Sequence, residues 1–270
     1  GTVPLDDLIL AEPATPVSEL VEPVVSSVPP EMDQEEVGRL LSRYNLVSMP
    51  VVNEFGQLLG RITFDDVIDV IEAEQTEDIL RLAGVSDDEG LRAGWGDAVR
   101  VRLPWLLVNL VTASVAASVV VVFSETIDAI WFLAAIMPVV AGMGGNSGTQ
   151  ALAVTVRHLA LAAGPLEKKF DAVKKEAVVG IVNGVVVGVL AAAVGTGAAL
   201  ALGLNLRLGL VVLLAMWGNI VVAGFAGAFI PTLLDRVGVD PAVASSVFVT
   251  TFTDLVGFFL LLGLASALLL

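Results

Sequence analysis

Long apolar runs dominate the last two thirds of the chain and carry almost no charge. Five of them are long enough to cross the roughly 30 Å hydrocarbon core of a lipid bilayer, which takes about 20 helical residues. A helix of a soluble protein rarely continues that far without a polar face. The pattern therefore predicts five membrane-spanning helices, at about 103–123, 129–156, 177–206, 209–234 and 241–270.

The first third has a different pattern, with short apolar stretches between polar ones. Residues 34–44 have the spacing of an amphipathic helix, and 51–52 and 58–63 are rich in β-formers on either side of a turn. A second amphipathic helix is expected at 65–74, opened by two acidic residues. The predicted fold is therefore a membrane all-α protein with a small cytoplasmic α/β domain.

Composition agrees with a lipid-embedded part, because 56% of the 270 residues are hydrophobic, 16% are charged, and the mean hydropathy is +0.87. Charge is uneven: residues 1–97 hold 5 basic and 21 acidic side chains, against 9 and 8 in the remainder. Such an acidic block repels nucleic acid and attracts cations, so no nucleic-acid partner is expected. The absence of cysteine excludes disulfides and thiolate ligands, and a single histidine argues against zinc or iron.

Basic residues in the loops predict the orientation of the spans. Arg100 and Arg102 precede the first span, and the loop between the second and third carries five basic residues: Arg157, Lys168, Lys169, Lys174 and Lys175. Cytoplasmic loops are enriched in Lys and Arg. We therefore expect a multi-pass protein of the cell membrane with a cytoplasmic N-terminus and an outside C-terminus.

Glycines and polar side chains interrupt the second apolar run at 138–150. Glycine at membrane depth either lets another helix approach or exposes backbone carbonyls to a water-filled lumen. Helix packing alone would explain the glycines but not Asn146 with Thr149 and Gln150. The pattern therefore favours a pore lining that includes Gly142, Gly145 and Asn146.

Asp254 lies near the middle of the fifth predicted span, within the segment Thr250–Gly257. A carboxylate there is costly unless it is hydrated, paired or metal-bound, although a protonated, hydrogen-bonded Asp is the alternative. Thr250 lies one helical turn before it, and oxygen ligands suit a hard cation such as Mg²⁺. One carboxylate per chain is little for a divalent ion, and a symmetric dimer would bring two together.

A dense acidic cluster runs through the second amphipathic helix and continues beyond it toward the first span: Asp65, Asp66, Asp69, Glu72, Glu74, Glu77 and Asp78. These carboxylates either form a solubilising linker or bind cytosolic Mg²⁺, which would then supply the free energy that closes a pore. The domain boundaries expected from this pattern are 1–71 for the α/β domain, 72–97 for the acidic connecting helix and linker, and 98–270 for the membrane part.

The α/β domain resembles a CBS domain, a regulatory module that often binds adenine nucleotides. In this resemblance Thr63 and Asp66 match the Thr-x-x-Asp that holds a ribose, which implies ATP at an incomplete CBS pair. Residues 1–22 are similar to the end of a preceding CBS repeat. This similarity suggests that the chain begins inside a longer protein.

The Gly-rich run 142–150, the five spans, Asp254 and the CBS-like domain together resemble the MgtE family of magnesium channels. The resemblance implies a homodimeric Mg²⁺ channel whose second and fifth helices line the pore, with Asp254 recognising hydrated Mg²⁺ and Gly257 beside it. It also implies a plug helix at 72–82 and a set of Mg²⁺-sensing carboxylates: Asp66, Asp69, Glu74, Glu77, Asp78 and Asp240.

Three other functions compete with a channel. A secondary transporter coupled to a proton or sodium gradient would need further ionisable residues within the spans, where Asp254 stands alone. A membrane enzyme would need a catalytic constellation, and none is recognisable. Asp254 argues against a receptor that senses ions without passing them. Co²⁺, Mn²⁺ and Ca²⁺ remain open as the natural ion.

Overall fold

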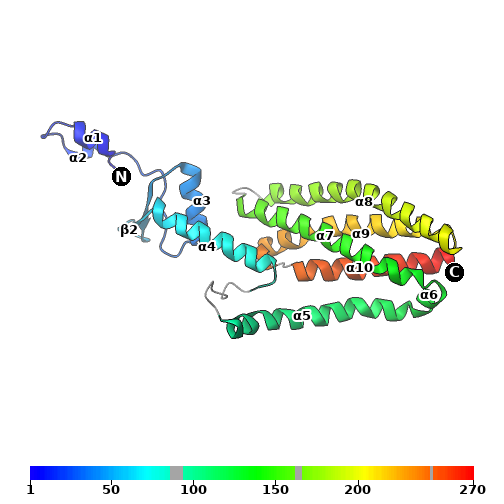
Figure 1. Cartoon of the computed structure of the whole chain (residues 1–270). Helices are drawn as coiled ribbons and strands as arrows, with labels where there is room; N and C mark the ends of the chain where they lie inside the picture. The colour runs from blue at the N-terminus through cyan, green and yellow to red at the C-terminus, as the bar shows by residue number, and fades with distance from the viewer. Residues whose placement is uncertain (86–93, 162–165, 244–245) are drawn as a thin grey trace. The chain divides into compact units, whose positions relative to one another are not determined.

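The computed structural model describes residues 1–85, 94–161, 166–243 and 246–270, with the backbone alone described at 161 and 166–169. The chain divides into two compact units, Gly1–Thr76 and Glu77–Leu270. The division falls inside one helix, α4 (Phe64–Leu82), which begins in the first unit and ends in the second. Figure 1 shows the elements of both units.

The first unit contains α1 (Leu5–Leu10), α2 (Val17–Leu20), α3 (Gln34–Tyr44), β1 (Ser48–Val52), β2 (Leu58–Thr63) and the start of α4. Its two strands pair antiparallel, with Ser48 opposite Thr63 and an irregularity between Val51 and Val52. From α3 onward the helix–strand–strand–helix order agrees with the sequence analysis, whereas the complete CBS fold stays a prediction.

A small apolar core holds α3, β1 and α4 of the first unit together. Its buried members are Val28, Val37, Leu41, Met49 and Val67. The amphipathic spacing of α3 places two of these, Val37 and Leu41, on one face. The loop between the strands is ordered by Asn53, whose side-chain oxygen accepts hydrogen bonds from the backbone N–H groups of two later loop residues at 3.0 and 2.8 Å.

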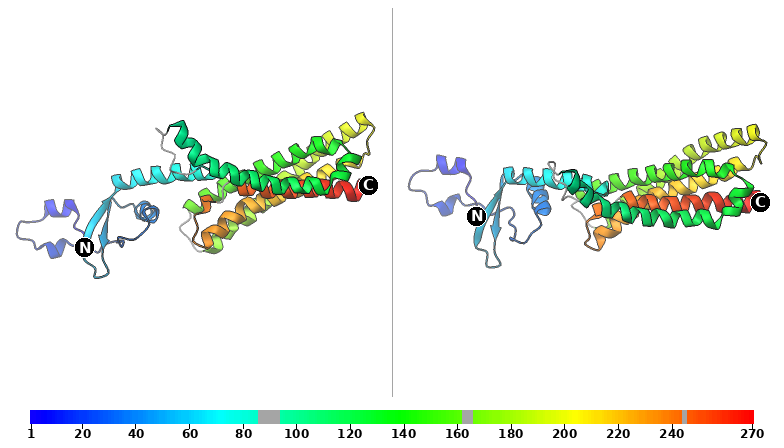
Figure 2. Two further views of the ribbon diagram at one scale, coloured as in Figure 1. Left: turned by 90° about the horizontal axis from the view of Figure 1, so that it is seen from below. Right: turned by 60° about the horizontal axis from the view of Figure 1, so that its bottom comes forward.

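The second unit is a bundle of long helices that run alongside one another in all views (Figures 1 and 2). Its elements after α4 are α5 (Trp95–Val122), α6 (Ser124–Ala129), α7 (Phe132–Leu161), α8 (Leu166–Leu202), α9 (Leu208–Arg236), the short 3₁₀ helix η1 (Pro241–Val243) and α10 (Ser246–Leu269).

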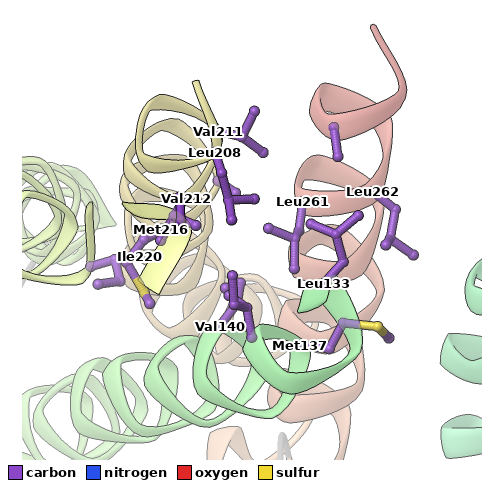
Figure 3. Close-up of a cluster of buried hydrophobic side chains, with 14 residues drawn as sticks. Leu133, Met137, Val140, Leu208, Val211, Val212, Met216, Ile220, Leu261 and Leu262 are labelled. Carbon is purple, nitrogen blue, oxygen red and sulfur yellow. The ribbon is translucent and has the colours of Figure 1, made fainter. Parts of the chain in front are cut away.

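Helix α9 forms the centre of this bundle, because it packs against α7, α8 and α10. More than half of its most apolar stretch, 56%, is buried, against 6% for α5. Figure 3 shows the main apolar cluster, in which Leu133 and Val140 of α7, Met216 and Ile220 of α9 and Leu261 of α10 point into one space. With Ala199 of α8 also among its buried members, this cluster ties four helices into one core.

A stripe of glycines brings α8 and α9 into close contact. A Cβ on Gly180, Gly184 or Gly188 of α8 would lie 3.0, 3.0 or 3.1 Å from a backbone carbonyl oxygen of α9. Small residues at four-residue spacing allow this approach in membrane helices, where packing rather than hydrophobic burial drives association. The α8–α9 contact is accordingly the most extensive between two helices of the bundle.

Four of these helices are long and apolar enough to cross a membrane: Trp95–Val122, Phe170–Leu202, Leu208–Arg236 and Ser246–Leu269. The span expected at 129–156 corresponds to α7, a 30-residue helix that is not among the four and whose apolar run is interrupted at 138–150. The count of five spans therefore stays a prediction. Helix α8, which corresponds to the third expected span, begins at Leu166, earlier than the expected start at 177.

Candidate functional site

The interrupted segment of α7 has two faces with different environments. Gly144, Gly145 and Gly148 are buried, and a Cβ on Gly148 would lie 2.6 Å from Cγ1 of Val249 on α10. The remaining members form an exposed polar stripe, which comprises Gly142, Asn146, Thr149 and Gln150. Their spacing of four, three and one residues places them on one side of a helix. Helix packing therefore accounts for some of the glycines, and the polar side chains lie on the opposite side.

Helix α10 runs antiparallel to α7 along this segment. A Cβ on Gly145 would lie 3.4 Å from Cγ2 of Thr250, and one on Gly257 would lie 3.3 Å from Cγ1 of Val140. Asp254 lies between Thr250 and Gly257 in sequence, so it is level with the stretch of α7 between Val140 and Gly145. The carboxylate and the start of the polar stripe are thus at the same depth of the bundle.

Asp254 is partly buried, and within the described parts of the chain no hydrogen bond or ion pair reaches its carboxylate. The hydroxyl of Thr250 donates to the carbonyl oxygens of Ser246 and Val247 of its own helix, at 2.8 and 3.2 Å. Thr253 is fully buried and donates to the carbonyl of Thr250 at 2.9 Å. Because both hydroxyl protons are used, these hydroxyls do not donate to Asp254 but keep oxygen lone pairs as acceptors.

A buried carboxylate lies near the start of α8, at the edge of a candidate membrane-spanning helix. Glu176 of α8 is 7% exposed, lies inside the span Phe170–Leu202, and pairs with Lys175, whose Nζ lies 3.3 Å from its Oε1. Its backbone carbonyl faces α9, since a Cβ on Gly224 would lie 2.7 Å from that oxygen. The expected span begins one residue later, at 177, so Asp254 stays the sole ionisable residue of the five expected spans.

The acidic residues expected to sense Mg²⁺ are divided between the two units. In the second unit Arg81 forms ion pairs with Glu77, one turn earlier in α4, and with Asp240, in the connection between α9 and η1. The other oxygen of Asp240 accepts from the backbone N–H of Ala242 at 2.8 Å. The end of α4 is thereby held at the end of the bundle where α9 ends and α10 begins.

Apolar contacts reinforce this attachment of α4. Leu82 packs against a cluster formed by residues near the ends of α7 and α9 and the start of α10, with Leu152 and Val249 among its buried members. Arg157, Lys174 and Lys175 belong to the ends of α7 and α8 at this same end of the bundle and are exposed. Lys168 and Lys169, which were counted with them, lie outside the described side chains.

In the first unit, Thr63 and Asp66 bond to each other at the start of α4. Asp66 Oδ2 accepts from the Thr63 hydroxyl at 2.5 Å and from its backbone N–H at 3.1 Å. These two bonds hold the pKa of Asp66 below its ordinary value, and the side-chain bond has the larger effect. Asp66 accepts both bonds and so caps the backbone N–H of Thr63 at the start of α4, which gives both residues a structural role whether or not a nucleotide binds.

The remaining members of the expected sensing set are not gathered. Glu74 accepts a hydrogen bond from the side chain of Gln34 at 2.8 Å, and Asp69 is exposed. Among the described residues, no group of three or more acidic, histidine or cysteine side chains could hold a metal ion. A complete sensing site is thus not formed by the described side chains of one chain.

Sequence reasoning missed three polar residues of the bundle: Arg81, Glu176 and Asn219. Asn219 is fully buried in α9 and lies against α7 and α10. A search for amides within the apolar runs, and not for charges alone, would have found it. Nothing in the sequence pairs Arg81 with Asp240, which is 159 residues away.

Comparison with protein families supports the resemblance seen in the sequence. Residues 137–264 match the MgtE family, described as divalent cation transporters, and residues 17–73 match the CBS domain. The first match covers most of α7, all of α8 and α9 and most of α10, and so includes the polar stripe and Asp254. The second covers α2, α3, both strands and the start of α4.

Curated relatives agree with these matches. The chain is 37% identical to the magnesium transporter MgtE of Thermus thermophilus, 34% to that of Bacillus subtilis and 36% to that of Enterococcus faecalis, over 98 to 100% of its own length. It spans 58 to 59% of the length of these relatives. The chain, with its CBS domain followed by a bundle of long apolar helices, belongs to the MgtE family.

Proposed function

We propose that this chain carries a pathway for Mg²⁺ across the cell membrane, lined by α7 and α10, with Asp254 as the residue that recognises the cation. The observation that carries the proposal is the carboxylate of Asp254, which is partly buried and has no partner among the described residues. Such a group is stable at membrane depth when water and a cation reach it. The three curated relatives are named magnesium transporters, which supports Mg²⁺ as the cargo.

The polar stripe of α7 supports the same pathway. Its amide and hydroxyl groups are exposed in the single chain, and hydrocarbon is a poor environment for an amide without a hydrogen-bond partner. The stripe therefore faces water or a second copy of the chain. A homodimer that places two copies of Asp254 about a twofold axis gives two carboxylates for one hydrated divalent cation.

Mg²⁺ keeps its water shell more firmly than larger cations, so a site of one carboxylate per chain and a few neutral oxygens suits the hydrated ion. Gly142 keeps a side chain out of the neighbourhood of that ion, Gly145 and Gly257 let α7 and α10 pack closely beside it, and Asn146 and Thr250 supply neutral oxygens. This chemistry does not distinguish Mg²⁺ from Co²⁺ or Mn²⁺. Uptake of Mg²⁺ measured in competition with these ions distinguishes them.

We further propose that the acidic segment regulates the pathway and lies in the cytoplasm, with the C-terminus outside. The exposed basic residues at the end of the bundle that holds α4 support this orientation. In this regulation Mg²⁺ binds the carboxylates of the expected sensing set, which are Glu77, Asp78 and Asp240 in the second unit and Asp66, Asp69 and Glu74 in the first. Arg81 already neutralises Glu77 and Asp240, so Mg²⁺ competes with a guanidinium there. ATP at Thr63 and Asp66 stays a prediction.

The pathway is tested by reconstituting the chain in liposomes and measuring Mg²⁺ uptake with an internal fluorescent indicator. Asp254→Asn removes the charge with little change in shape, and its uptake is expected to fall at least tenfold. Asp128→Asn, which changes an exposed residue of the short helix α6, is the matched control and is expected to transport normally. Normal uptake by a folded Asp254→Asn protein would refute the assignment.

Glu176 favours a second candidate function, a transporter that couples Mg²⁺ movement to a proton gradient. A buried carboxylate within a span is the kind of group that relays protons. Coupling predicts that a pH gradient drives Mg²⁺ against its own gradient and that Glu176→Gln abolishes this drive. A channel predicts uptake that follows the electrochemical gradient of Mg²⁺ alone, with or without Glu176.

A further inference from the structure

A carboxamide lies at the point where three helices of the bundle meet. Asn219 of α9 is fully buried, and its Nδ2 donates to the backbone carbonyl oxygen of Val140 on α7 at 3.0 Å. Its Oδ1 has no hydrogen-bond partner among the described residues. A buried amide oxygen without a partner destabilises the fold, so the position calls for an explanation beyond filling space.

Two glycines on two other helices make room for this amide. A Cβ on Gly144 of α7 would overlap Nδ2 of Asn219 and lie 2.9 Å from its Cγ, and a Cβ on Gly257 of α10 would lie 2.6 Å from Nδ2. The amide is therefore a spacer that separates α7 from α10 by its own thickness. Any side chain at 144 or 257 would displace it.

The backbone that Asn219 holds is a weak point of α7. Pro138 lies two residues before Val140 inside the helix, and a proline has no N–H to donate to the carbonyl four residues earlier. A helix can bend where such a bond is missing. The bond from Asn219 fixes the carbonyl of Val140 just after this point, at the beginning of the segment that carries the polar stripe.

We propose that Asn219 is a positioning residue for cation passage, which sets the separation and the local direction of α7 and α10 beside Asp254. This inference rests on the proposed pathway between those two helices. Gly257 lies three residues after Asp254 on α10, and Gly144 lies between Gly142 and Asn146 on α7. A shift of the amide therefore moves both walls of the pathway at the depth of the carboxylate.

A purely structural role and a positioning role predict different results when the amide is replaced by an apolar side chain. Leu has a similar branched shape, removes the unpaired oxygen, and leaves Val140 with its ordinary helical partner. Stability is therefore expected to stay the same or to rise, because an unsatisfied buried polar atom has been removed. Positioning, in contrast, is lost together with the bond to Val140.

The test compares Asn219→Leu with Thr232→Val in reconstituted liposomes. Thr232 is the matched control, because it is also fully buried on α9 and bonds only within its own helix, to the carbonyl of Ala228 at 2.7 Å. For Asn219→Leu we expect an unchanged or higher unfolding temperature. We also expect a rise of roughly fivefold in half-saturating Mg²⁺, about 1 kcal/mol, and weaker discrimination against Co²⁺ and Ca²⁺.

The inference is overturned if Asn219→Leu transports with the wild-type half-saturation and ion preference. If Asn219→Leu does not fold, the half-saturating Mg²⁺ concentration and the ion preference are measured on Asn219→Ala instead. A second measurement uses Gly144→Ala, which is expected to unfold at lower temperature in the wild-type chain but not beside Asn219→Ala, where the overlapping amide is gone. If the effects of Gly144→Ala and Asn219→Ala on the unfolding temperature were additive, the role of the Asn219 amide as a spacer would be contradicted.

Failure of this inference can be told apart from failure of the proposed pathway. If Asp254→Asn loses uptake while Asn219→Leu behaves as wild type, the pathway stands and the positioning role does not. If Asp254→Asn transports normally, the pathway itself is wrong.

Discussion

Two glycines of the bundle give opposite expectations for the same added methyl group. Gly227 of α9 faces α7: a Cβ there would overlap the carbonyl oxygen of Gly148 and lie 2.9 Å from Cβ of Ala151 and 3.1 Å from the backbone N of Leu152. A Cβ on Gly142, on the polar stripe of α7, would lie more than 4 Å from every described atom outside its own stretch of helix. The substitutions Gly227→Ala and Gly142→Ala are therefore a matched pair.

The magnitudes follow from these surroundings. The atoms facing Gly227 are backbone or Cβ atoms that cannot rotate away, so α7 and α9 must separate, which costs about 1–3 kcal/mol. For a chain of this size the unfolding temperature then falls by roughly 2–12 °C. Gly142→Ala instead removes a flexible residue from a helix, which favours folding by about 0.5–1 kcal/mol. Its unfolding temperature is expected to stay level or rise slightly.

The assay is thermal unfolding of the detergent-purified protein, followed by tryptophan fluorescence, together with Mg²⁺ uptake in liposomes. Gly142→Ala is expected to fold normally but to transport less, because its methyl group enters the proposed pathway. A wild-type unfolding temperature for Gly227→Ala would refute the α7–α9 packing. Equal destabilisation by both variants would refute the division of α7 into a packed face and an open face.

Two further predictions concern charged residues outside the spans. Arg81→Gln frees Glu77 and Asp240 from their ion pairs. Mg²⁺ uptake in the absence of internal Mg²⁺ should therefore rise, and inhibition by internal Mg²⁺ should begin at a lower concentration. Dose–inhibition curves measure both effects. Asp66→Asn removes a carboxylate whose folded-state pKa is lowered by Thr63. Ionised Asp66 stabilises the fold, so its contribution is present above its ordinary pKa of 3.8 and is lost as the pH falls through the lower folded-state pKa. The difference in hydrogen exchange between wild type and Asp66→Asn should therefore shrink on acidification.

Each of these changes has a control in the first unit. Arg39 forms an ion pair with Glu35 one turn away on α3, at 2.6 Å, and Arg39→Gln should leave the Mg²⁺ dependence of uptake unchanged. Asp65 is exposed at the start of α4, and Asp65→Asn should keep the wild-type pH dependence. Identical inhibition curves for Arg81→Gln and wild type would exclude competition between Arg81 and Mg²⁺. If the difference in hydrogen exchange between Asp66→Asn and wild type stayed constant across the acid range, the proposed link between protonation of Asp66 and stability would be excluded.

The apolar runs predicted where the long helices lie, because length and hydropathy depend on sequence alone. They did not predict which side of each helix faces its neighbours. A helix such as α9 is apolar all round, so no polar face orients it. That is why Asn219 was overlooked, although it lies in the middle of a predicted span.

The site was predicted unevenly for the same physical reason. Asp254 could be recognised because a charge in an apolar run is anomalous wherever it points. Gly142 and Gly145 were grouped as lining residues, but Gly145 is buried against Thr250 and Gly142 is open, a distinction that depends on the packing of α10. The ion pairs of Arg81 depend on the return of the chain between α9 and α10, which no local pattern encodes.

The glycine stripe of α8 has a mechanical consequence. Where backbones touch without intervening side chains, two helices cannot slide past each other without a steric collision, so α8 and α9 behave as one rigid block. Helix α5, by contrast, rests on the bundle through few contacts, chiefly with α10, and includes a hydroxyl pair between Thr112 and Thr251. A structural change that opens or closes this protein would thus move α5 against a stationary frame made of α8 and α9.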